Sequence, residues 1–242
     1  SLASGNIGIG HTRWATHGSV TEDNTHPHLD CTGKIAVVHN GIIENYQGLR
    51  KQFSSHKFVS ETDTEIIAHI IEDYMNQHIP FDCAVAEAVK FLKGRSAFVA
   101  VDSDSKKIVA VRKGTPLIVG VGEDEFFIAS DITAFFNHTK KVQYLDDNEL
   151  VVIDNDAEFF KAQGGKIEKR VVEIDWQPET AAKEGYKHYL IKEIMDQKDT
   201  LYRAINQDEE KIMSVASDIN NAYGTFLVGC GTAGKVCMAG EY

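Results

Sequence analysis

The chain has 242 residues, of which 43% are hydrophobic, so it has enough apolar side chains for an ordinary core and is not a disordered chain. Its 25 basic and 36 acidic side chains give a formal net charge of −11, which repels nucleic-acid phosphates. No apolar run approaches the roughly 18 residues that span a bilayer, and no signal-peptide pattern stands at the start. We therefore expect a soluble cytoplasmic protein that binds neither nucleic acid nor membrane.

The chain begins at Ser1 without a methionine and runs directly into a dense motif, so we expect its N-terminus to be truncated. The cysteine spacing fits neither a C-x-x-C metal site nor a dense disulfide framework. We expect free thiols at all four positions, which are Cys31, Cys83, Cys230 and Cys237.

The first half of the chain predicts a strand followed by helices. Residues 35–39 are rich in β-branched side chains, and residues 42–53 place apolar side chains on one helical face. A second helix is predicted to begin near Asp63, because Thr62-x-x-Glu65 has the form of a capping box. A third helix is predicted over 82–93, and Gly94 follows it.

From residue 96 the sequence changes to short runs rich in β-forming residues, separated by Asp, Asn, Ser and Gly. Helices grouped early and strands grouped late favour a layered α+β domain over a repeated βαβ pattern. The predicted strands lie within 96–102, 106–114, 116–122, 125–131, 149–154, 157–163 and 169–175.

The sequence predicts three parts. Residues 1–175 form the main domain, and 176–222 form a linker and a docking helix that runs from Tyr189. Residues 223–242 start a strand, a glycine turn and a helix, which is typical of the beginning of an α/β domain. The turn also matches G-x-G-x-x-G, so a dinucleotide is one alternative; an anion at the helix N-terminus is the part of this interpretation that the short segment supports.

The segment 8–18 places an arginine, a tryptophan, two threonines and two histidines between glycines, a composition typical of a small-molecule site. The planar guanidinium of Arg13 suits a carboxylate. The alternative is a strand with Arg13 satisfied at its edge.

Asn40 and Gly41 follow a predicted strand and precede a predicted helix. An amide side chain and a glycine N–H can converge there on one oxygen, as a tetrahedral acyl intermediate requires. The alternative is an ordinary Asn-Gly turn. Asp63 is either part of a helix cap or a carboxylate that pairs with the α-ammonium group of an amino acid.

Histidines crowd the first 40 residues, yet their spacing includes no His-x-x-x-His pair on a helix, and no cysteine pair completes a metal site. We expect no metal there, and we interpret the rings as hydrogen-bonding groups of a polar site. These residues are His11, His17, His26, His28 and His39.

Four motifs in fixed order, HTRWATHG at 11–18, NTHPH at 24–28, HNGIIEN at 39–45 and SETDTE at 60–65, closely resemble the class II glutamine amidotransferases. The resemblance continues through GTPLIVGVG, FFIASD and KHYLIKEI to GCGT, and so covers nearly the whole chain. The last two motifs favour the group that aminates fructose 6-phosphate to glucosamine 6-phosphate.

The resemblance implies an N-terminal-nucleophile hydrolase fold, an αββα sandwich, here incomplete and followed by the start of a sugar-isomerase-type domain. It implies that an N-terminal cysteine, which this chain does not contain, attacks the glutamine amide. It implies no cofactor and no metal, with L-glutamine and fructose 6-phosphate as substrates of a homo-oligomer.

The resemblance also assigns roles to individual residues. Asn40 and the Gly41 N–H form the oxyanion hole, and the remaining residues bind substrate. For glutamine these are Arg13, Trp14, Thr16, His17, Asp63 and the Gly41 carbonyl, and for the sugar phosphate Thr232. The alternatives are the glutaminase domain of another class II amidotransferase and a catalytically inactive glutamine-binding module.

Overall fold

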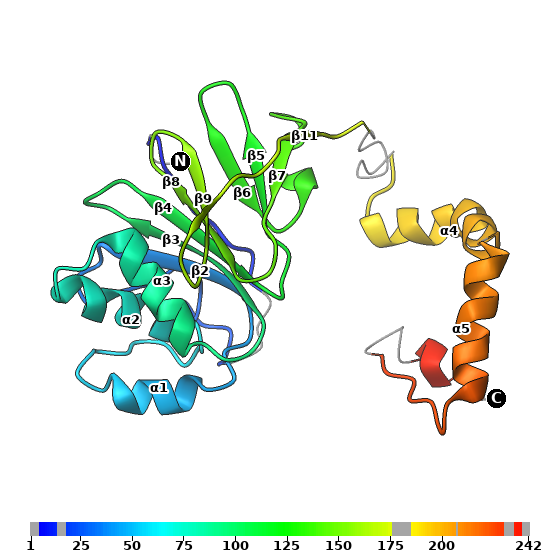
Figure 1. The fold of residues 1–242 in the computed structure, drawn as a ribbon, viewed down its shortest axis with the longest axis horizontal. Helices are drawn as coiled ribbons and strands as arrows, with labels where there is room; N and C mark the ends of the chain where they lie inside the picture. Colours follow the sequence, from blue (N-terminus) through cyan, green and yellow to red (C-terminus); the bar gives the residue numbers. More distant parts are fainter. Residues whose placement is uncertain (1–4, 14–17, 176–184, 207, 230–234, 239–242) are drawn as a thin grey trace. The chain divides into compact units, whose positions relative to one another are not determined.

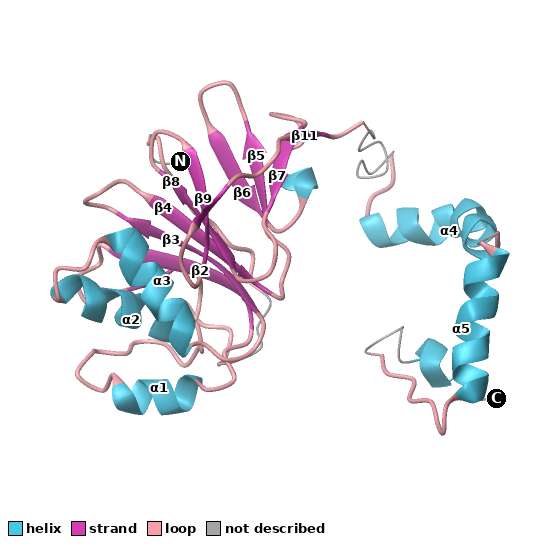
Figure 2. Cartoon of the chain, in the orientation of Figure 1, coloured by secondary structure: helices cyan, strands magenta, loops and turns pink. Residues whose placement is uncertain are grey.

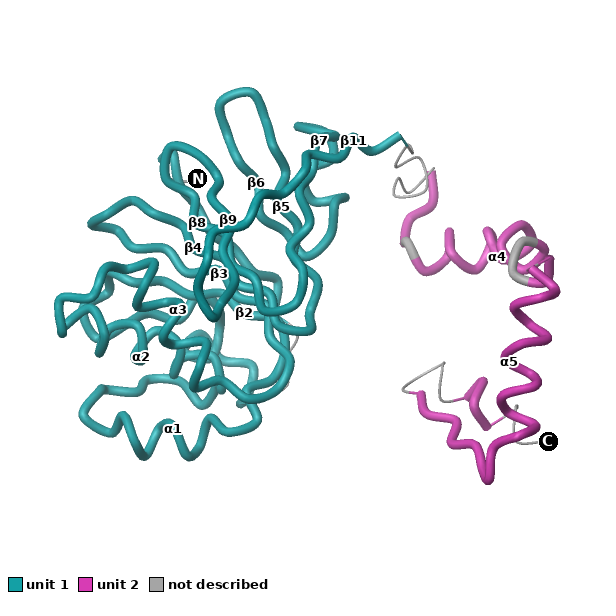
Figure 3. The backbone as a smooth tube through the Cα atoms, viewed as in Figure 1, with its two compact units in different colours: residues 1–178 teal, residues 179–242 magenta. Residues whose placement is uncertain are grey.

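A computed structural model describes residues 5–13, 18–175, 185–206, 208–229 and 235–238. The chain divides into two compact units, residues 1–178 and residues 179–242 (Figure 3). Among the described residues, the first unit carries two antiparallel sheets and three α-helices, and the second carries two further α-helices and a helical stretch at 235–238.

The larger sheet of the first unit has seven strands, and every neighbouring pair is antiparallel. In spatial order they are β1 (His28–Leu29), β2 (Ile35–Gly41), β3 (Ser96–Asp102), β4 (Ile108–Lys113), β8 (Glu149–Ile153), β9 (Ala157–Lys161) and β10 (Lys166–Ile167). The smaller sheet has the order β11 (Val172–Glu173), β7 (Lys141–Tyr144), β5 (Ile118–Val121) and β6 (Phe126–Ala129). The helices are α1 (Tyr46–Gln52), α2 (Glu65–Asn76) and α3 (Phe81–Phe91), with a 3-10 turn, η1, at Ile132–Ala134.

The side chains of the central strands alternate between the two faces of the large sheet, and this alternation produces the layers of the unit. In β4, Val109 and Val111 join the core cluster that includes α2 and α3, whereas Ala110 joins the cluster that includes Val119 of β5. Because successive side chains of a strand point to opposite faces, the large sheet has a helical layer on one face and the small sheet on the other (Figures 1 and 2). The predicted layered α+β architecture is confirmed.

Helix α2 is the best-buried helix of the unit. Ile66, Ile67, Ile70 and Ile71 are each at most 1% exposed, as their helical spacing requires for one face against the sheet. The capping-box prediction is wrong, because α2 begins at Glu65 and its N-cap makes no side-chain hydrogen bond. The Glu65 carboxylate accepts N–H groups of the preceding loop instead, so it anchors that loop rather than closing a box.

The start of the first helix also differs from the prediction. Helix α1 begins at Tyr46 rather than at residue 42, because the Ile42 N–H donates to the Arg95 carbonyl (2.9 Å) and the Ile43 N–H to Asp63 (2.7 Å). These bonds hold the segment against β3 and the loop before α2, away from a helical turn.

The docking helix predicted from Tyr189 is two helices, α4 (Tyr189–Ile205) and α5 (Glu209–Asn221). The side chain of Asp208 starts the second helix by accepting the N–H groups of Glu210 and Lys211. The strand predicted near 225–229 is not formed, since no strand of the described residues lies beside this segment to share its hydrogen bonds. Residues 235–238 are helical.

The described helices include none with both the length and the apolar character needed to cross a bilayer. Cys31, Cys83 and Cys237 are free thiols, as predicted. Cys230 lies outside the described residues.

Replacing Ile70 by alanine tests the packing of α2 on the large sheet. Ile70 is 0% exposed, and removing its buried methylene and methyl groups leaves a cavity, so the free energy of unfolding should fall by about 2–5 kcal/mol. Urea unfolding followed by circular dichroism measures the change. Val20→Ala, at a position 85% exposed, is the control and should change stability by less than about 0.5 kcal/mol. Equal midpoints for the two variants would contradict this packing.

Candidate functional site

A hollow of about 310 Å³ lies where β2 ends and where the chain approaches α2. It brings together four of the residues predicted to form a site, namely Arg13, Asn40, Gly41 and Asp63. The other lining residues are His11, His26, His39, Ile42, Thr62 and Thr64. Trp14, Thr16, His17 and Thr232, which the sequence also predicted, lie outside the described residues.

The side chain of Asn40 is oriented by a histidine ring. His11 Nδ1 accepts the Arg13 backbone N–H (2.9 Å), so its proton is on Nε2, which lies 2.7 Å from Asn40 Oδ1. This pair of bonds assigns the neutral tautomer of His11 and makes the Asn40 oxygen an acceptor. The Nδ2 group of Asn40 then serves as the donor that the amide offers to a ligand.

Gly41 is the last residue of β2 and must be a glycine. Its φ is +127°, and a Cβ built there would lie 2.1 Å from the carbonyl oxygen of Arg95. Only a residue without a side chain permits this approach of β2 to the residue before β3. The residue is exposed, and it lines the hollow with backbone atoms alone.

Asp63 brings a carboxylate to the other side of the Asn40-Gly41 turn. It is 3% exposed, and its Oδ2 accepts the Ile43 N–H at 2.7 Å. The bond ties the segment after Gly41 to the start of α2. A carboxylate next to a helix N-terminus is further stabilised by the helix dipole.

Arg13 is held by the loop that follows the tryptophan motif. Its guanidinium donates to the carbonyls of Ser19 (3.1 Å) and Gly18 (3.4 Å). That loop is fixed in turn, since Asn24 donates to the Ser19 carbonyl and to Glu61, and Glu61 accepts the Ser19 N–H. A Cβ at Gly18 would lie 2.8 Å from the Asn24 amide, so the loop closes only around glycine.

Histidine rings form one wall of the hollow. His11 stacks on His26 with 4.4 Å between ring centroids, and His26 meets His28 edge-on at 4.9 Å. The backbone N–H of His39 donates to His26 Nδ1 (3.2 Å), and the ring atom His39 Nδ1 lies 2.9 Å from the Thr64 hydroxyl. The rings therefore connect β1, β2 and the segment that leads into α2.

Burial keeps three rings of this wall, His26, His28 and His39, uncharged at neutral pH. It lowers the pKa of His26 from 6.5 to about 3, and the repulsion that a protonated His26 would meet from the neighbouring imidazoles His11 and His28, were they protonated too, acts in the same direction. Burial likewise lowers the pKa of His39 to about 4 and lowers the pKa of His28. Besides the histidines, the ionisable side chains that line the hollow are one basic group, Arg13, and one acidic group, Asp63.

The sequence interpretation treated His11 only as one of several hydrogen-bonding rings of a polar site, and it gave no role to Asn24 or Glu61. His11 orients Asn40, and Asn24 and Glu61 fix the loop that holds Arg13. Each of these residues lies inside a motif that the sequence analysis singled out, and membership of a motif was the only sequence signal for its role. The contacts themselves join segments up to 37 residues apart, so local sequence does not reveal them.

Residues 11–137, which make up more than half of the chain, match the family described as "Glutamine amidotransferase domain". This range contains every described residue of the hollow.

The chain is similar to proteins named glutamine–fructose-6-phosphate aminotransferase [isomerizing] from several organisms. It is 45% identical to the protein of Methanothermobacter thermautotrophicus, over 98% of this chain and 41% of that one. It is 44% identical to the Clostridium perfringens protein (98% and 41%) and 43% identical to the Thermococcus kodakarensis protein (98% and 40%). The chain thus spans about two fifths of the length of these relatives.

Two solved structures share the fold. One is the glutamine phosphoribosylpyrophosphate amidotransferase from B. subtilis, at 24% identity and a TM-score of 0.53, covering 63% of this chain and 34% of that one. The other is titled as the allosteric regulatory enzyme of purine biosynthesis, at 25% identity with the same TM-score and coverage. These similarities confirm the expected N-terminal-nucleophile hydrolase type of fold. The chain belongs to the glutamine amidotransferase family.

Proposed function

We propose that this chain is the glutaminase part of a glutamine–fructose-6-phosphate aminotransferase. It binds L-glutamine in the hollow at the end of β2 and helps release ammonia from the side-chain amide. The observation that carries the proposal is the placement of Arg13 and Asp63, of opposite charge, around the Asn40-Gly41 turn in a hollow that the uncharged rings of His26 and His39 also line.

The charges of the hollow match those of a free amino acid. A guanidinium forks onto a carboxylate in two parallel hydrogen bonds, so Arg13 holds the α-carboxylate of glutamine. Asp63 and the Gly41 carbonyl hold the α-ammonium group. Trp14, Thr16 and His17, which the family resemblance also assigns to glutamine, would complete the site from the adjoining loop.

Hydrolysis of the amide develops negative charge on the amide oxygen. In the family mechanism a cysteine thiolate attacks the amide carbon, ammonia leaves, and water hydrolyses the thioester to glutamate. Asn40 Nδ2 and the Gly41 N–H are the two donors for the oxyanion. His11 is a positioning residue, since it fixes the Asn40 amide through Oδ1 and thereby aims its N–H groups.

The acceptor of ammonia is proposed to be fructose 6-phosphate, with glucosamine 6-phosphate as product. Sequence similarity at 43–45% identity extends over 98% of the chain, well beyond the domain that ends at residue 137, and each of these relatives carries this name. Three domains at 1–175, 176–222 and 223–242, a phosphate contact at Thr232, a homo-oligomer and a cytoplasmic location stay predictions.

A glutaminase domain for another acceptor is the alternative within the family, and its bound glutamine would be the same. A catalytically inactive glutamine-binding module is the alternative outside enzymes. It predicts saturable glutamine binding without hydrolysis, and a cysteine encoded upstream of residue 1 in the parent reading frame would eliminate it.

Arg13→Ala should weaken the binding of L-glutamine by about 10–100-fold, the loss expected of one charge-assisted pair. Isothermal titration calorimetry on this chain measures the affinity. Arg170→Ala, at an exposed position in another part of the unit, is the matched control and should bind as the unaltered chain does. Equal affinities for both variants would remove the carboxylate assignment.

Asn40→Ala should lower kcat for glutamine hydrolysis by about 10²–10³ while KM stays nearly constant, because the lost donor acts on the oxyanion rather than on bound glutamine. The rate is measured by glutamate release, in a form of the protein that carries a cysteine ahead of residue 1. Asn76→Ala, on the exposed end of α2, controls for a general effect of removing an amide. An unchanged kcat would refute the oxyanion role.

Acidification should destabilise the fold through the histidine wall. The folded pKa of His26, about 3, lies below its ordinary 6.5, so the unfolded chain binds the proton first and stability falls as the pH drops from about 6.5 toward 3. Urea midpoints at a series of pH values should fall over this window and fall less in His26→Gln. His138→Gln, at an exposed ring, is the control and should keep the original slope. An unchanged slope in His26→Gln would contradict the buried neutral ring.

A further inference from the structure

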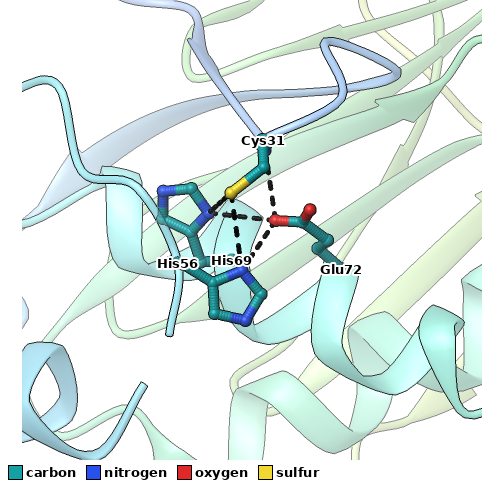
Figure 4. Close-up of side chains that lie close together, drawn as sticks. All are labelled: Cys31, His56, His69 and Glu72. Carbon is teal, nitrogen blue, oxygen red and sulfur yellow. Dashed lines mark hydrogen bonds and ion pairs between the residues drawn. The ribbon is translucent and has the colours of Figure 1, made fainter. Parts of the chain in front are cut away.

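Four side chains from three segments converge at a point that the glutamine hollow does not include (Figure 4). Cys31 follows β1, His56 lies in the loop between α1 and α2, and His69 and Glu72 are one turn apart on α2. Each offers one ligand atom, and these four atoms all lie within 4.8 Å of one another. A thiol, two imidazoles and a carboxylate are the ligand types that zinc takes in proteins.

The spacing of these atoms suits a tetrahedral ion. Cys31 Sγ lies 3.7 Å from His56 Nδ1 and 3.7 Å from His69 Nδ1. Zn–S bonds of ~2.3 Å and Zn–N bonds of ~2.0–2.1 Å at a tetrahedral angle separate sulfur from nitrogen by about 3.5–3.6 Å. Glu72 Oε2 is 2.8 Å and 3.1 Å from the same two nitrogens. In a tetrahedral zinc site these oxygen-to-nitrogen distances are longer, so the Glu72 oxygen would move away from the two nitrogens by about 0.3–0.6 Å.

The opposite edges of both rings also fit a metal. His56 Nε2 and His69 Nε2 are buried and make no hydrogen bond. A carboxylate oxygen nevertheless lies near each of them: Asp73 Oδ1 is 3.7 Å from His56 Nε2, and Glu65 Oε1 is 3.6 Å from His69 Nε2. If both Nδ1 atoms donate to Glu72, the lone pairs of neutral rings face these carboxylates. A cation that takes the Nδ1 lone pairs moves the protons to Nε2, where the carboxylates accept them, the arrangement in which metal-bound histidines are usually held.

The charges of the four ligands and the exposure of Cys31 to solvent also favour a zinc ion at this position. A thiolate and a carboxylate together carry two negative charges, which a divalent ion neutralises, and sulfur and imidazole ligands select zinc over magnesium or calcium. The Lys57 N–H lies 3.4 Å from Cys31 Sγ, and the Cys31 N–H donates to Glu72 at 3.1 Å, so the backbone holds both anionic groups in place. Cys31 is exposed, which gives an ion a route from solvent.

We propose that Cys31, His56, His69 and Glu72 form a structural Zn²⁺ site. Four protein ligands fill a tetrahedral shell, so the ion would cross-link segments rather than activate water. It would join the turn after β1 and the loop before α2 to α2 itself. The sequence interpretation expected no metal, since these ligands are spread from residue 31 to residue 72 and match none of the compact metal motifs.

The test is zinc titration of the full chain, purified with a phosphine reductant and stripped with a chelator. The chain should bind one zinc ion, and zinc should raise the melting temperature. Cys31→Ser should weaken zinc binding by more than the roughly 10–100-fold that is lost when a residue that only hydrogen-bonds to a metal ligand is removed. Cys83→Ser, at the other exposed cysteine of the first unit, is the matched control and should bind zinc normally.

Cobalt titration gives a second readout, because a thiolate-to-cobalt charge-transfer band appears only when a cysteine is a ligand; the band should be present in Cys83→Ser and lost in Cys31→Ser. His56→Gln, checked for folding by circular dichroism, should weaken zinc binding while retaining the thiol. The proposal is overturned if the chain binds no stoichiometric zinc, or if Cys31→Ser and His56→Gln bind it as Cys83→Ser does. None of these measurements involves glutamine, so their failure would leave the proposed glutaminase function untouched.

Discussion

The geometry of the candidate site depends on one close backbone contact, where β2 leaves β3. At Gly41 the chain passes so near the Arg95 carbonyl that a methyl group would not fit, and the next N–H, of Ile42, donates to that same carbonyl. The turn that follows is therefore fixed to the sheet rather than to a loop. Asn40 is the residue before Gly41 and pairs with Ala97 of β3, so the amide that would face an oxyanion stands on a hydrogen-bonded strand, a support that favours preorganised donors.

Helix α2 couples this turn to the proposed metal site through a buried carboxylate. Burial opposes the charge on Glu65, but the nearby His69 ring and the hydrogen bonds from the backbone N–H groups of Val59 and Ser60 outweigh it and lower the pKa of Glu65 to about 2. A charge held this firmly fixes the loop that enters the helix. Asp63 lies in that entry and His69 lies one turn inside the helix, so both sites share the same support.

Patterns of local origin predicted most of the elements. The β-branched run at 35–39 and the isoleucine stripe of α2 gave β2 and α2, because burial on one face imposes their periodicity. Short strands such as β1 and β10, of two residues each, carry no such pattern and form only because a neighbouring strand accepts their hydrogen bonds. The capping box failed for the same reason, since Thr62 bonds His28, 34 residues away, and local sequence holds no record of that partner.

The motifs likewise pointed to Arg13, Asn40 and Asp63, but the state of the histidines beside them depends on burial, which only the fold determines. That state matters for the proposed reaction. Ammonia takes a proton from any nearby group that is more acidic than the ammonium ion and then ceases to be a nucleophile. The protonated form of a histidine of ordinary pKa is such a group and is partly populated at neutral pH. With pKa values of about 3 and 4, His26 and His39 hold no proton to give from a cationic ring. The burial that opposes their charge therefore keeps these two rings from protonating the ammonia that the proposed reaction would release.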